Sequence, residues 1–424
     1  MLAELNTVDE WQQTTLGEIC NMRAGTVFPR ILQGKRTGKY PFVKVSDMNL
    51  AENATFIRSA NNYVDEVDLS LLKAKPLPAG TTIFAKIGEG LKQNRLRLLV
   101  KPTIVDNNMM GALPIAERVD PRFFFYALSQ FDFGEIAEGT ALPYLAVGDL
   151  PRLNLYLPPL SNQHAIANIL GSLDDKIELN REMNETLEAT ARAIFKSWFV
   201  DFDPVRAKMQ GREPVGMDAE TAALFPSAFQ DSPLGEIPEG WEVATIGEDF
   251  NLTMGQSPPG STYNENANGT PFYQGRKDFG FRYPTRRVFC AAPTRLAAEG
   301  DTLVSVRAPV GDINMASEKC CVGRGLAAIR HKTGSRSYTY YAMQFLQEDF
   351  HRYEAEGTVF GSINKENFET LSHLRPPDGI IEAFESSVYS MDQSIENNEN
   401  QSRTLSEIRD TLLPKLLSGE IRVA

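Results

Sequence analysis

Residues 158–199 read PPLSNQHAIANILGSLDDKIELNREMNETLEATARAIFKSWF, and their apolar residues recur every seven positions. This heptad pattern predicts a long helix with a coiled-coil seam. Asn180 and Asn184 interrupt the seam, and a polar residue at such a position usually fixes register and partner choice at some cost in stability. The predicted seam consists of Ile166, Leu173, Leu187 and Ile194 on one heptad position and Leu170, Ile177, Ala191 and Trp198 on the other.

A second copy of this seam lies 218 residues further along the chain, and we expect it to be the partner of the first. Asn398 takes the place of Asn180 there, and the run LDDKIELN at 173–180 is echoed by MDQSIENN at 391–398. A Pro-Pro pair precedes each helix, and proline favours the start of a helix. The second seam consists of Phe384, Met391, Leu405 and Leu412 on one position and Val388, Ile395 and Leu416 on the other.

The rest of the chain repeats too, which predicts the order domain, helix, domain, helix. The strand-like run at 80–88 returns at 300–306, and the aromatic run at 123–128, which predicts a helix packed on the sheet, is echoed at 341–343. Two copies of one domain that keep the same turn, strand and helix signals but differ in their loops are suited to binding two different ligands at a fixed separation. Further repeated landmarks are Trp11 and Trp241, Leu16-Gly17-Glu18 and Ile246-Gly247-Glu248, and Tyr40-Pro41-Phe42 and Thr270-Pro271-Phe272.

The fold class that this repeat predicts is α+β, with two mixed α/β domains joined by two long helices and related by a pseudo-twofold axis. The segment between the first helix and the second domain is rich in Pro, Gly and Asp, so we interpret it as a connector with one short helix near 219–224. The predicted boundaries are 1–157 and 241–376 for the domains, 158–200 and 377–424 for the helices, and 201–240 for the connector.

Composition excludes several classes of protein. The 424 residues are 42% apolar and 23% charged, which is ordinary for a soluble globular protein of two or three domains. No run of eighteen apolar residues occurs, and the amino terminus lacks a basic region followed by an apolar run, so we expect no membrane association and a cytoplasmic location. The cysteines Cys20, Cys290, Cys320 and Cys321 have no metal-ligand spacing, which fits a reducing compartment.

Catalytic motifs are absent from the sequence. It contains no phosphate-binding loop, no Asn/Asp-Pro-Pro-aromatic run of the amino-methyltransferases, and no G-x-S-x-G, H-E-x-x-H or C-x-x-C. The triplet Asp174-Asp175-Lys176 invites a nuclease interpretation, but on a helix these residues point in different directions, so we favour a solvated charged face. We therefore expect a chain without catalytic residues, bound metal or bound cofactor of its own.

The helix at 158–199 and the segment after it carry a resemblance to a known family. The runs LDDKIELN at 173–180, NETLEA at 184–189 and FKSWFVDFDPV at 195–205 resemble the central helix of specificity subunits of type I restriction-modification systems. The carboxyl-terminal helix departs from the pattern at Gln393 and Ser394 and contains Pro414 near its end. The resemblance covers the whole chain, because that family is built as recognition domain, spacer helix, recognition domain, spacer helix.

The resemblance implies a noncatalytic subunit that reads a bipartite target on double-stranded DNA. In that family the two helices lie antiparallel and set the distance between half-sites. The expected partners are two methyltransferase subunits, which bind S-adenosylmethionine, and, in the full complex, two restriction subunits, which use ATP and Mg²⁺. The alternative that we keep is a divergent fused DNA methyltransferase or nuclease; a coiled-coil scaffold that does not touch DNA is a weaker one.

A net charge of −12 is unexpected for a DNA-binding protein, but the acidic excess lies mainly on the helices and connector. Phosphate binding needs only a local basic patch, and Arg, Gln and Asn can read base edges. The DNA-contact residues that we predict are, in the first domain, Lys35, Arg36, Lys39, Lys44, Lys86, Lys92, Gln93, Asn94, Arg95 and Arg97, and, in the second, Gln274, Arg276, Lys277, Arg282, Arg286, Arg287 and Arg307.

Apolar residues outside the seam could offer a docking face to a partner subunit. Phe195, Phe199 and Leu413 are the candidates, with packing against the connector as the equal alternative. A helix of about 40 residues is about 60 Å long, which is enough to hold two small domains about one DNA turn or more apart.

Overall fold

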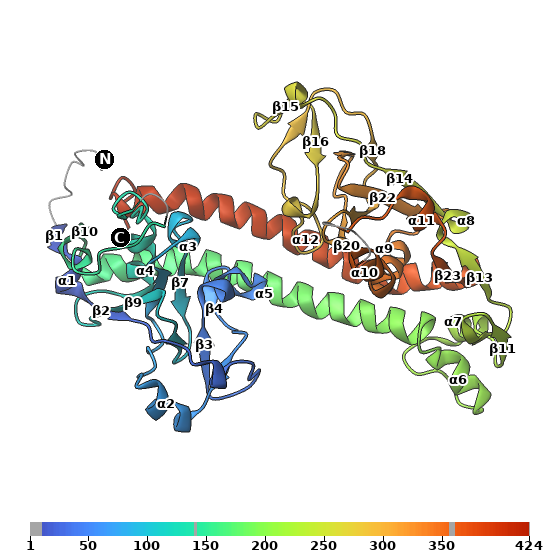
Figure 1. Cartoon of the computed structure of the whole chain (residues 1–424), viewed down its shortest axis with the longest axis horizontal. Coiled ribbons are helices and arrows are strands. Elements are labelled where there is room, and N and C mark those ends of the chain that lie inside the picture. Colours follow the sequence, from blue (N-terminus) through green and yellow to red (C-terminus); the bar gives the residue numbers. More distant parts are fainter. Residues whose placement is uncertain (1–10, 140–141, 356–360, 424) are drawn as a thin grey trace. The chain divides into compact units, whose positions relative to one another are not determined.

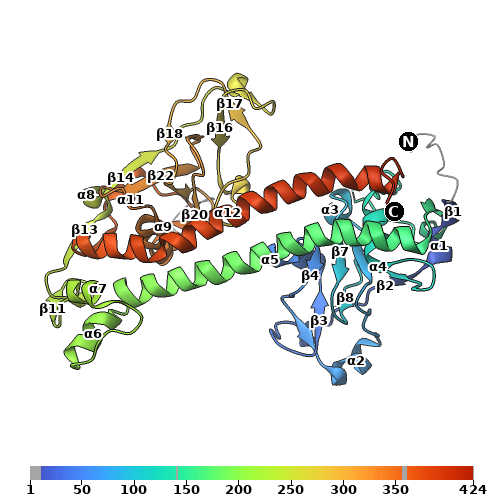
Figure 2. The same ribbon diagram turned by 180° about the vertical axis from the view of Figure 1, so that it is seen from behind.

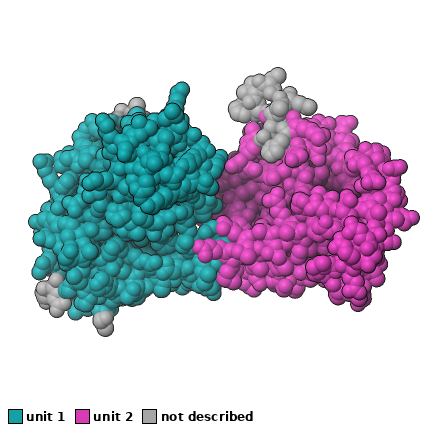
Figure 3. All heavy atoms as spheres, turned by 90° about the horizontal axis from the view of Figure 1, so that it is seen from below, with its two compact units in different colours: residues 1–181, 400–424 teal, residues 182–399 magenta. Residues whose placement is uncertain are grey.

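The computed structural model describes residues 11–139, 142–355 and 361–423, apart from the side chains of residues 351, 354 and 355. The chain forms two compact units, shown in different colours in Figure 3. Unit 1 comprises Met1–Arg181 and Asn400–Ala424, and unit 2 comprises Glu182–Glu399. Each unit therefore contains one globular domain and one part of each long helix. The amino-terminal residues on which the predicted absence of a targeting signal rests lie outside the described residues.

Unit 1 has a five-stranded sheet in the order β2-β9-β6-β7-β4, a small sheet in the order β5-β3-β8 and a two-stranded ribbon, β1-β10 (Figure 1). The run at 80–88 contains the buried strand β6, and the aromatic run forms α4, so both predictions are confirmed. The elements are β1 Gln12–Thr15, α1 Leu16–Ile19, β2 Cys20–Ala24, β3 Tyr40–Val43, β4 Phe56–Ile57, β5 Tyr63–Val64, α2 Glu66–Leu72, β6 Thr82–Ala85, α3 Glu89–Lys92, β7 Leu96–Leu99, β8 Ile104–Val105, β9 Met109–Pro114, α4 Pro121–Ser129 and β10 Asn154–Leu157.

Unit 2 repeats this plan. It has a four-stranded sheet, β14-β22-β19-β20, a five-stranded sheet, β15-β17-β16-β21-β18, and the ribbons β13-β23 and β11-β12. The elements are α6 Asp203–Met209, α7 Ala219–Leu224, β11 Phe229–Ser232, β12 Gly235–Pro238, β13 Glu242–Thr245, α8 Ile246–Asp249, β14 Phe250–Met254, β15 Tyr263–Asn264, β16 Thr270–Tyr273, β17 Phe289–Cys290, β18 Leu296–Ala297, β19 Thr302–Val306, β20 Val310–Met315, β21 Cys320–Val322, β22 Leu326–His331, α9 Arg336–Phe345, α10 Gln347–Ala355, α11 Lys365–Glu369 and β23 Ser372–Arg375.

The first turn of each domain shows how closely the repeat is kept. In unit 1, Thr15 and Glu18 form a capping box on α1, and in unit 2, Thr245 and Glu248 form the same box on α8. In each box the Glu carboxylate accepts the backbone N–H of the capping Thr, at 3.1 Å in unit 1 and 2.8 Å in unit 2. The short helix then leads directly into β2 in one unit and into β14 in the other, which fixes the edge strand of each sheet.

The two long helices are α5, Leu160–Phe199, and α12, Asp378–Leu417. Figure 1 and Figure 2, which show opposite views, place the two helices side by side in each unit. They pair antiparallel, because Asn180 contacts Ser402 in unit 1 while Asn184 contacts Asn398 in unit 2. The predicted antiparallel pair is confirmed. Although a proline removes one helical hydrogen bond, α12 continues to Leu417, past Pro414.

The connector between the first long helix and the second domain is packed, and it contains more structure than the one short helix predicted for it. The short helix predicted near 219–224 is present as α7, but α6 and the β11-β12 hairpin were not predicted. Phe202 and Phe225 are 7% and 1% exposed. The ring of Phe225 lies edge-on to Trp198 of α5, at 5.2 Å between centroids, and Phe202 packs on Trp241. These aromatic residues bury enough surface to order a segment whose Pro, Gly and Asp content indicated only a connector.

Candidate nucleic-acid interface

Buried asparagines join the two long helices in each unit. In unit 1, Nδ2 of Asn180 donates to Oε1 of Gln401 (2.9 Å) and to Oγ of Ser402 (3.2 Å). In unit 2, Nδ2 of Asn398 donates to Oδ1 of Asn184 (2.9 Å). Asn398 and Ser402 are the repeats of Asn180 and Asn184, so each unit holds the same pair of positions with the helices exchanged. A slipped register would break these buried hydrogen bonds, so the asparagines fix the register of the pair.

The seam residues predicted from the heptads are shielded from solvent. None of the seam residues is exposed, and neither is Asn180 or Asn398. Those that are buried are Ile166, Leu170, Asn180, Ala191, Trp198, Phe384, Val388, Ile395 and Leu416, and those that are half-buried are Leu173, Ile177, Leu187, Ile194, Met391, Asn398, Leu405 and Leu412. Ile166 and Leu170 also belong to the apolar core that contains the aromatic face of α4. The helices are therefore held both to each other and to the domains.

Asp174 is not on a solvated face, so the interpretation of this residue as a surface charge was wrong. Its side chain is 1% exposed and accepts hydrogen bonds from the Tyr126 hydroxyl (2.6 Å) and from the Arg409 guanidinium (2.6 Å). Burial, followed by the Asp174 carboxylate, raises the pKa of Tyr126, so the phenol stays a proton donor. Asp175 is exposed as predicted and makes a two-pronged ion pair with Arg122 of α4 (2.7 and 2.9 Å).

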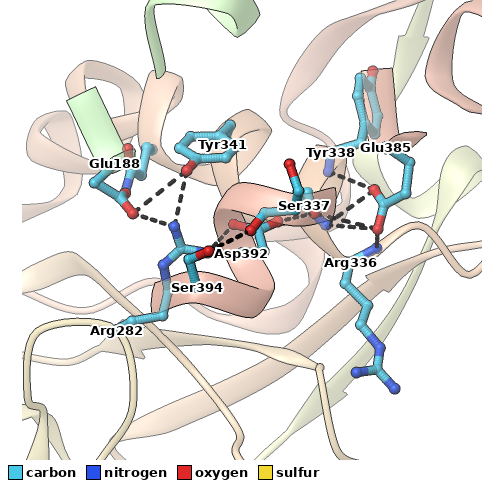
Figure 4. A network of polar contacts seen from close by, with 11 residues as sticks. Glu188, Arg282, Arg336, Ser337, Tyr338, Tyr341, Glu385, Asp392 and Ser394 are labelled. Carbon is cyan, nitrogen blue, oxygen red and sulfur yellow. Dashed lines mark hydrogen bonds and ion pairs between the residues drawn. The ribbon is translucent and has the colours of Figure 1, made fainter. Parts of the chain in front are cut away.

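Asp392, the repeat of Asp174, lies in a larger polar network in unit 2 (Figure 4). Its Oδ1 accepts from Nη1 of Arg282 (3.0 Å), and its Oδ2 accepts from the hydroxyl of Ser337. The second prong of Arg282 donates to Glu188 of α5 and to the hydroxyl of Tyr341 (2.8 Å). One guanidinium from the globular domain thus joins α5, α9 and α12.

Arg282 is a structural cation, and its prediction as a DNA contact was wrong. Its side chain is 0% exposed and lies 4.2 Å from the ring centroid of Tyr340. Burial alone would lower the pKa of Arg282, but the tyrosine rings beside it and the carboxylates of Glu188 and Asp392 raise it above its usual range. In unit 1 the cation for Asp174 comes from α12, whereas α5 has Ala191 at the repeat of Arg409. The domain supplies the missing charge in unit 2.

A second anchor in unit 2 was not found from the sequence. The carboxylate of Glu385 accepts the backbone N–H groups of Arg336 (3.0 Å), Ser337 (3.1 Å) and Tyr338 (3.2 Å) at the start of α9. A carboxylate stabilises a helix start because the first N–H groups have no partners within the helix. No local pattern reveals this cap, because Glu385 comes from α12, nearly fifty residues further along the chain.

Two of the three candidates for a docking face, Phe195 and Phe199, are not available, so the docking hypothesis is wrong for them. Phe195 and Phe199 are 4% and 7% exposed and belong to the apolar core of unit 2. Leu413 is half-buried against the core of unit 1. Local packing is correct for the two phenylalanines, but the neighbours that bury them include Tyr338 of α9 and Phe384 of α12, where packing against the connector was expected.

The predicted DNA contacts of the first domain differ in how free their side chains are. Lys35 and Lys39 are exposed but form ion pairs with Asp65 and Glu66. Asn94 bonds the backbone of the segment after α4 through both amide atoms. Of the others, Arg36, Lys92 and Gln93 are exposed, and Lys44, Lys86 and Arg95 are half-buried.

Arg97 has a structural position on β7. Its guanidinium donates to the backbone carbonyls of Met48 (2.8 Å), Asn53 and Leu96 (2.7 Å). Burial, helped by the charge of Arg95, lowers the pKa of Arg97 to about 10. With these bonds made, Arg97 has little capacity left to read a base edge, and it braces the loops before β4.

In the second domain the predicted contacts other than Arg282 are all exposed. Three of the arginines are ion-paired: Arg276 with Asp312 (2.7 Å), Arg287 with Asp278 (3.0 Å), and Arg286 with Glu318. Within the described part of the chain, no ion pair involves the remaining cations, Lys277 and Arg307, and Gln274 is exposed beside them in sequence. DNA contact by these residues stays a prediction.

Among the described residues, no group of three or more His, Cys, Asp or Glu side chains is placed to hold a metal ion. Over the same residues, no helix is both long enough and apolar enough to span a membrane.

The fold and the polar anchors define a class of protein: two repeated mixed α/β domains carried on a shared pair of antiparallel helices. A family model described as the type I restriction modification DNA specificity domain matches this chain twice, at residues 8–189 and 238–378. The chain belongs to the family of type I restriction-modification specificity subunits.

Individual relatives agree with this assignment. A putative type I restriction enzyme specificity subunit, MjaX, from Methanocaldococcus jannaschii is 31% identical over 98% of this chain and 94% of its own. The HindI specificity subunit from Haemophilus influenzae is 27% identical over 88% of this chain and 96% of its own. The crystal structure of a type I S subunit from M. genitalium has the same fold, with a TM-score of 0.57 and 18% identity over 97% of both chains.

Proposed function

We propose that this chain selects a bipartite site on double-stranded DNA, with each globular domain reading one half-site. The observation that carries the proposal is that Asn180 of α5 in unit 1 and Asn398 of α12 in unit 2 occupy equivalent positions and make equivalent contacts with the other helix. The helix pair is therefore a common support for two copies of one domain. The loops that carry the exposed Arg, Lys and Gln residues differ in sequence between the two domains. Different loops on one scaffold suit two different half-sites.

The length of the helix pair would set the interval between the half-sites. Each helix has 40 residues. At about 1.5 Å per residue this is about 60 Å, which is more than one turn of B-DNA, about 34 to 36 Å. A gap of unread base pairs between the half-sites follows from such a support.

The chemistry would be done by other subunits. We propose that the chain assembles with two methyltransferase subunits, which bind S-adenosylmethionine, and with two restriction subunits, which use ATP and Mg²⁺, and that it works in the cytoplasm. The repeat supports two equivalent methyltransferase positions, since a surface present in both copies offers the same contacts twice. The chain itself would bind no cofactor and catalyse no step.

Binding and methyl transfer with purified components test the proposal. We expect the full chain to bind a duplex with both half-sites more tightly than a duplex with either one, with an affinity that falls steeply as salt rises. We expect methyl transfer only after the methyltransferase subunit is added. Methyl transfer or S-adenosylmethionine binding by the rigorously purified chain would favour the fused enzyme, and equal binding to all duplexes would contradict a reader of bipartite sites.

A further inference from the structure

A pocket with three cations on its rim lies in the first domain. Its volume is about 380 Å³, and its lining includes Arg23 at the end of β2 and Lys73 and Lys75 after α2. All three side chains are exposed. Within residues 11–139, 142–355 and 361–423, none of the three forms an ion pair, in contrast to Lys35 and Lys39 of the same domain.

Gly25 lines this pocket and allows two segments of backbone to lie close together there. At Gly25 a Cβ atom would lie 1.8 Å from the carbonyl oxygen of Asp106 and 2.5 Å from that of Val105, so no side chain fits there. The backbone N–H of Thr26 bonds the carbonyl of Val105 (2.9 Å). Asp106 pairs with Thr26 in a β-bridge but does not line the pocket, and its carboxylate accepts the backbone N–H of Asn108 (2.8 Å). The rim is therefore positive without a carboxylate in the lining.

The second domain repeats this close approach of two backbone segments. At Gly255 a Cβ atom would lie 2.1 Å from the carbonyl oxygen of Gly323. The backbone N–H of Gln256 bonds the carbonyl of Val322 (3.0 Å), as Thr26 bonds Val105 in the first domain. Two domains with different loops thus place a glycine against the end of the same strand, which is β8 for Gly25 and β21 for Gly255. We call this feature the glycine turn.

Strand pairing shows which residues beside the two glycine turns are equivalent. Leu77 pairs with Thr103 just before β8, and Ala297 pairs with Cys320 of β21. Leu77 and Ala297 are therefore the same position, and so are Lys75 and Arg295, two residues earlier. Arg324, just after β21, adds a second cation to the second domain. Arg295 and Arg324 are both exposed, and neither forms an ion pair within the described residues.

We propose that the glycine turn with its cations is a phosphate-binding site repeated in the two domains, formed by Arg23, Lys73 and Lys75 around Gly25 and by Arg295 and Arg324 around Gly255. Its ligand is a phosphodiester of the DNA backbone. This inference rests on the proposed function, because a duplex must reach both domains. Since phosphate contacts position a protein on DNA without reading bases, the same site can serve two domains that read different half-sites. The phosphate contact that both domains share would position the DNA, and the loops that differ between the domains would read its sequence.

Salt dependence measures the number of phosphate contacts. The slope of log K against log salt is about −0.9 per phosphate neutralised on B-DNA. We would compare the full wild-type chain with the double variant Lys73→Asn/Lys75→Gln on a duplex that carries the target mapped in the host. Asn is chosen at position 73 because this residue has φ 48°, where Asn is tolerated. The expected result is a slope less steep by about one, with the ratio of target to non-target affinity unchanged.

A control matched in charge is Arg152→Gln/Lys415→Gln. These residues also belong to unit 1, and both are ion-paired, with Asp149 and Glu420. We expect the control to keep the wild-type slope. The variant Arg295→Gln/Arg324→Gln tests the second domain, with the same expected loss. Thermal unfolding of each variant should match the wild type, because all of these side chains are exposed or ion-paired at the surface.

The outcomes separate this inference from the proposed function. An unchanged slope in both test variants, with specific binding intact in the wild type, would overturn the phosphate site and leave the proposed function standing. No preference of the wild type for the bipartite duplex would overturn the proposed function itself. Titration of the wild type with inorganic phosphate at constant ionic strength is the third arm. Saturable phosphate binding that the test variants lose, without any change in DNA slope, would assign the site to a free anion and contradict the DNA-backbone assignment.

Discussion

Replacing Arg282 should destabilise unit 2 more than any other single change to a cation of the second domain. The substitution Arg282→Met keeps an unbranched apolar stem and removes the guanidinium. It leaves Glu188 and Asp392, each with a side chain 17% exposed, without the charge that they share. Removing one partner of a buried ion pair typically costs about 3–5 kcal/mol, because the remaining charge is desolvated and uncompensated. The stacking of Arg282 on Tyr340 is lost as well.

Tryptophan fluorescence during denaturation is a suitable assay. Trp198 and Trp241 are 5% and 1% exposed in the core of unit 2, so their emission reports on that unit. For a unit of roughly 200 residues, about 3–5 kcal/mol corresponds to a fall of roughly 6–20 °C in Tm.

The triple variant Arg282→Met/Glu188→Gln/Asp392→Asn is the control for the charge argument. Replacing a whole buried ion network by neutral groups is often close to neutral in stability, so the triple variant should recover most of the loss. A triple variant no more stable than Arg282→Met would refute the reasoning. So would a single variant as stable as the wild type, since the network would then carry no net compensation.

Three further predictions follow from the same structure. Glu385→Ala removes the cap of α9 and should cost about 1 kcal/mol, whereas the exposed Glu382→Ala on the same helix should be neutral; thermal unfolding measures both. Burial lowers the pKa values of His331 and His373 below their usual 6.5, so their contribution to unit 2 is complete above pH 6.5 and is lost as the pH falls below it; a denaturation midpoint no lower at pH 5.5 than at pH 7.5 would contradict this. Three heptads inserted after Arg181 and after Glu399 lengthen the helix pair by about 31 Å, so the unread gap should grow by about nine base pairs; an unchanged gap in the methylated sites would reject the helix pair as the spacer.

The helices and the repeat could be predicted because their cause is periodic. A heptad places one face of a helix against a partner wherever it occurs, so Ile166, Leu170, Phe384 and Val388 could be assigned without knowledge of the domains. The same periodicity marked Asn180 as a residue that fixes register. The packing of the connector could not be predicted, for the opposite reason. Phe202 and Phe225 follow no period, and they pack against Trp198 and Trp241, which only the folded chain brings beside them.

The functional charges could be predicted only in part. Sequence reasoning recognised clusters of cations, but whether a cation faces solvent depends on carboxylates that are distant in the chain. Arg282 lies 94 residues from Glu188 and 110 from Asp392, and no local pattern connects them. Lys73 and Lys75 were not predicted as DNA contacts for a similar reason. The glycine turn that they flank is almost fifty residues earlier in the sequence.

Mapping methylated bases in the host genome, with and without this gene, tests the central claim most directly. If the chain chooses the DNA site for a type I system, a motif of two short half-sites separated by a fixed gap should be methylated only when the gene is present. Exchange of residues 241–376 for the corresponding domain of another specificity subunit should then replace one half-site and keep the other. Methylation unaffected by loss of the gene, or a single undivided motif, would contradict the account.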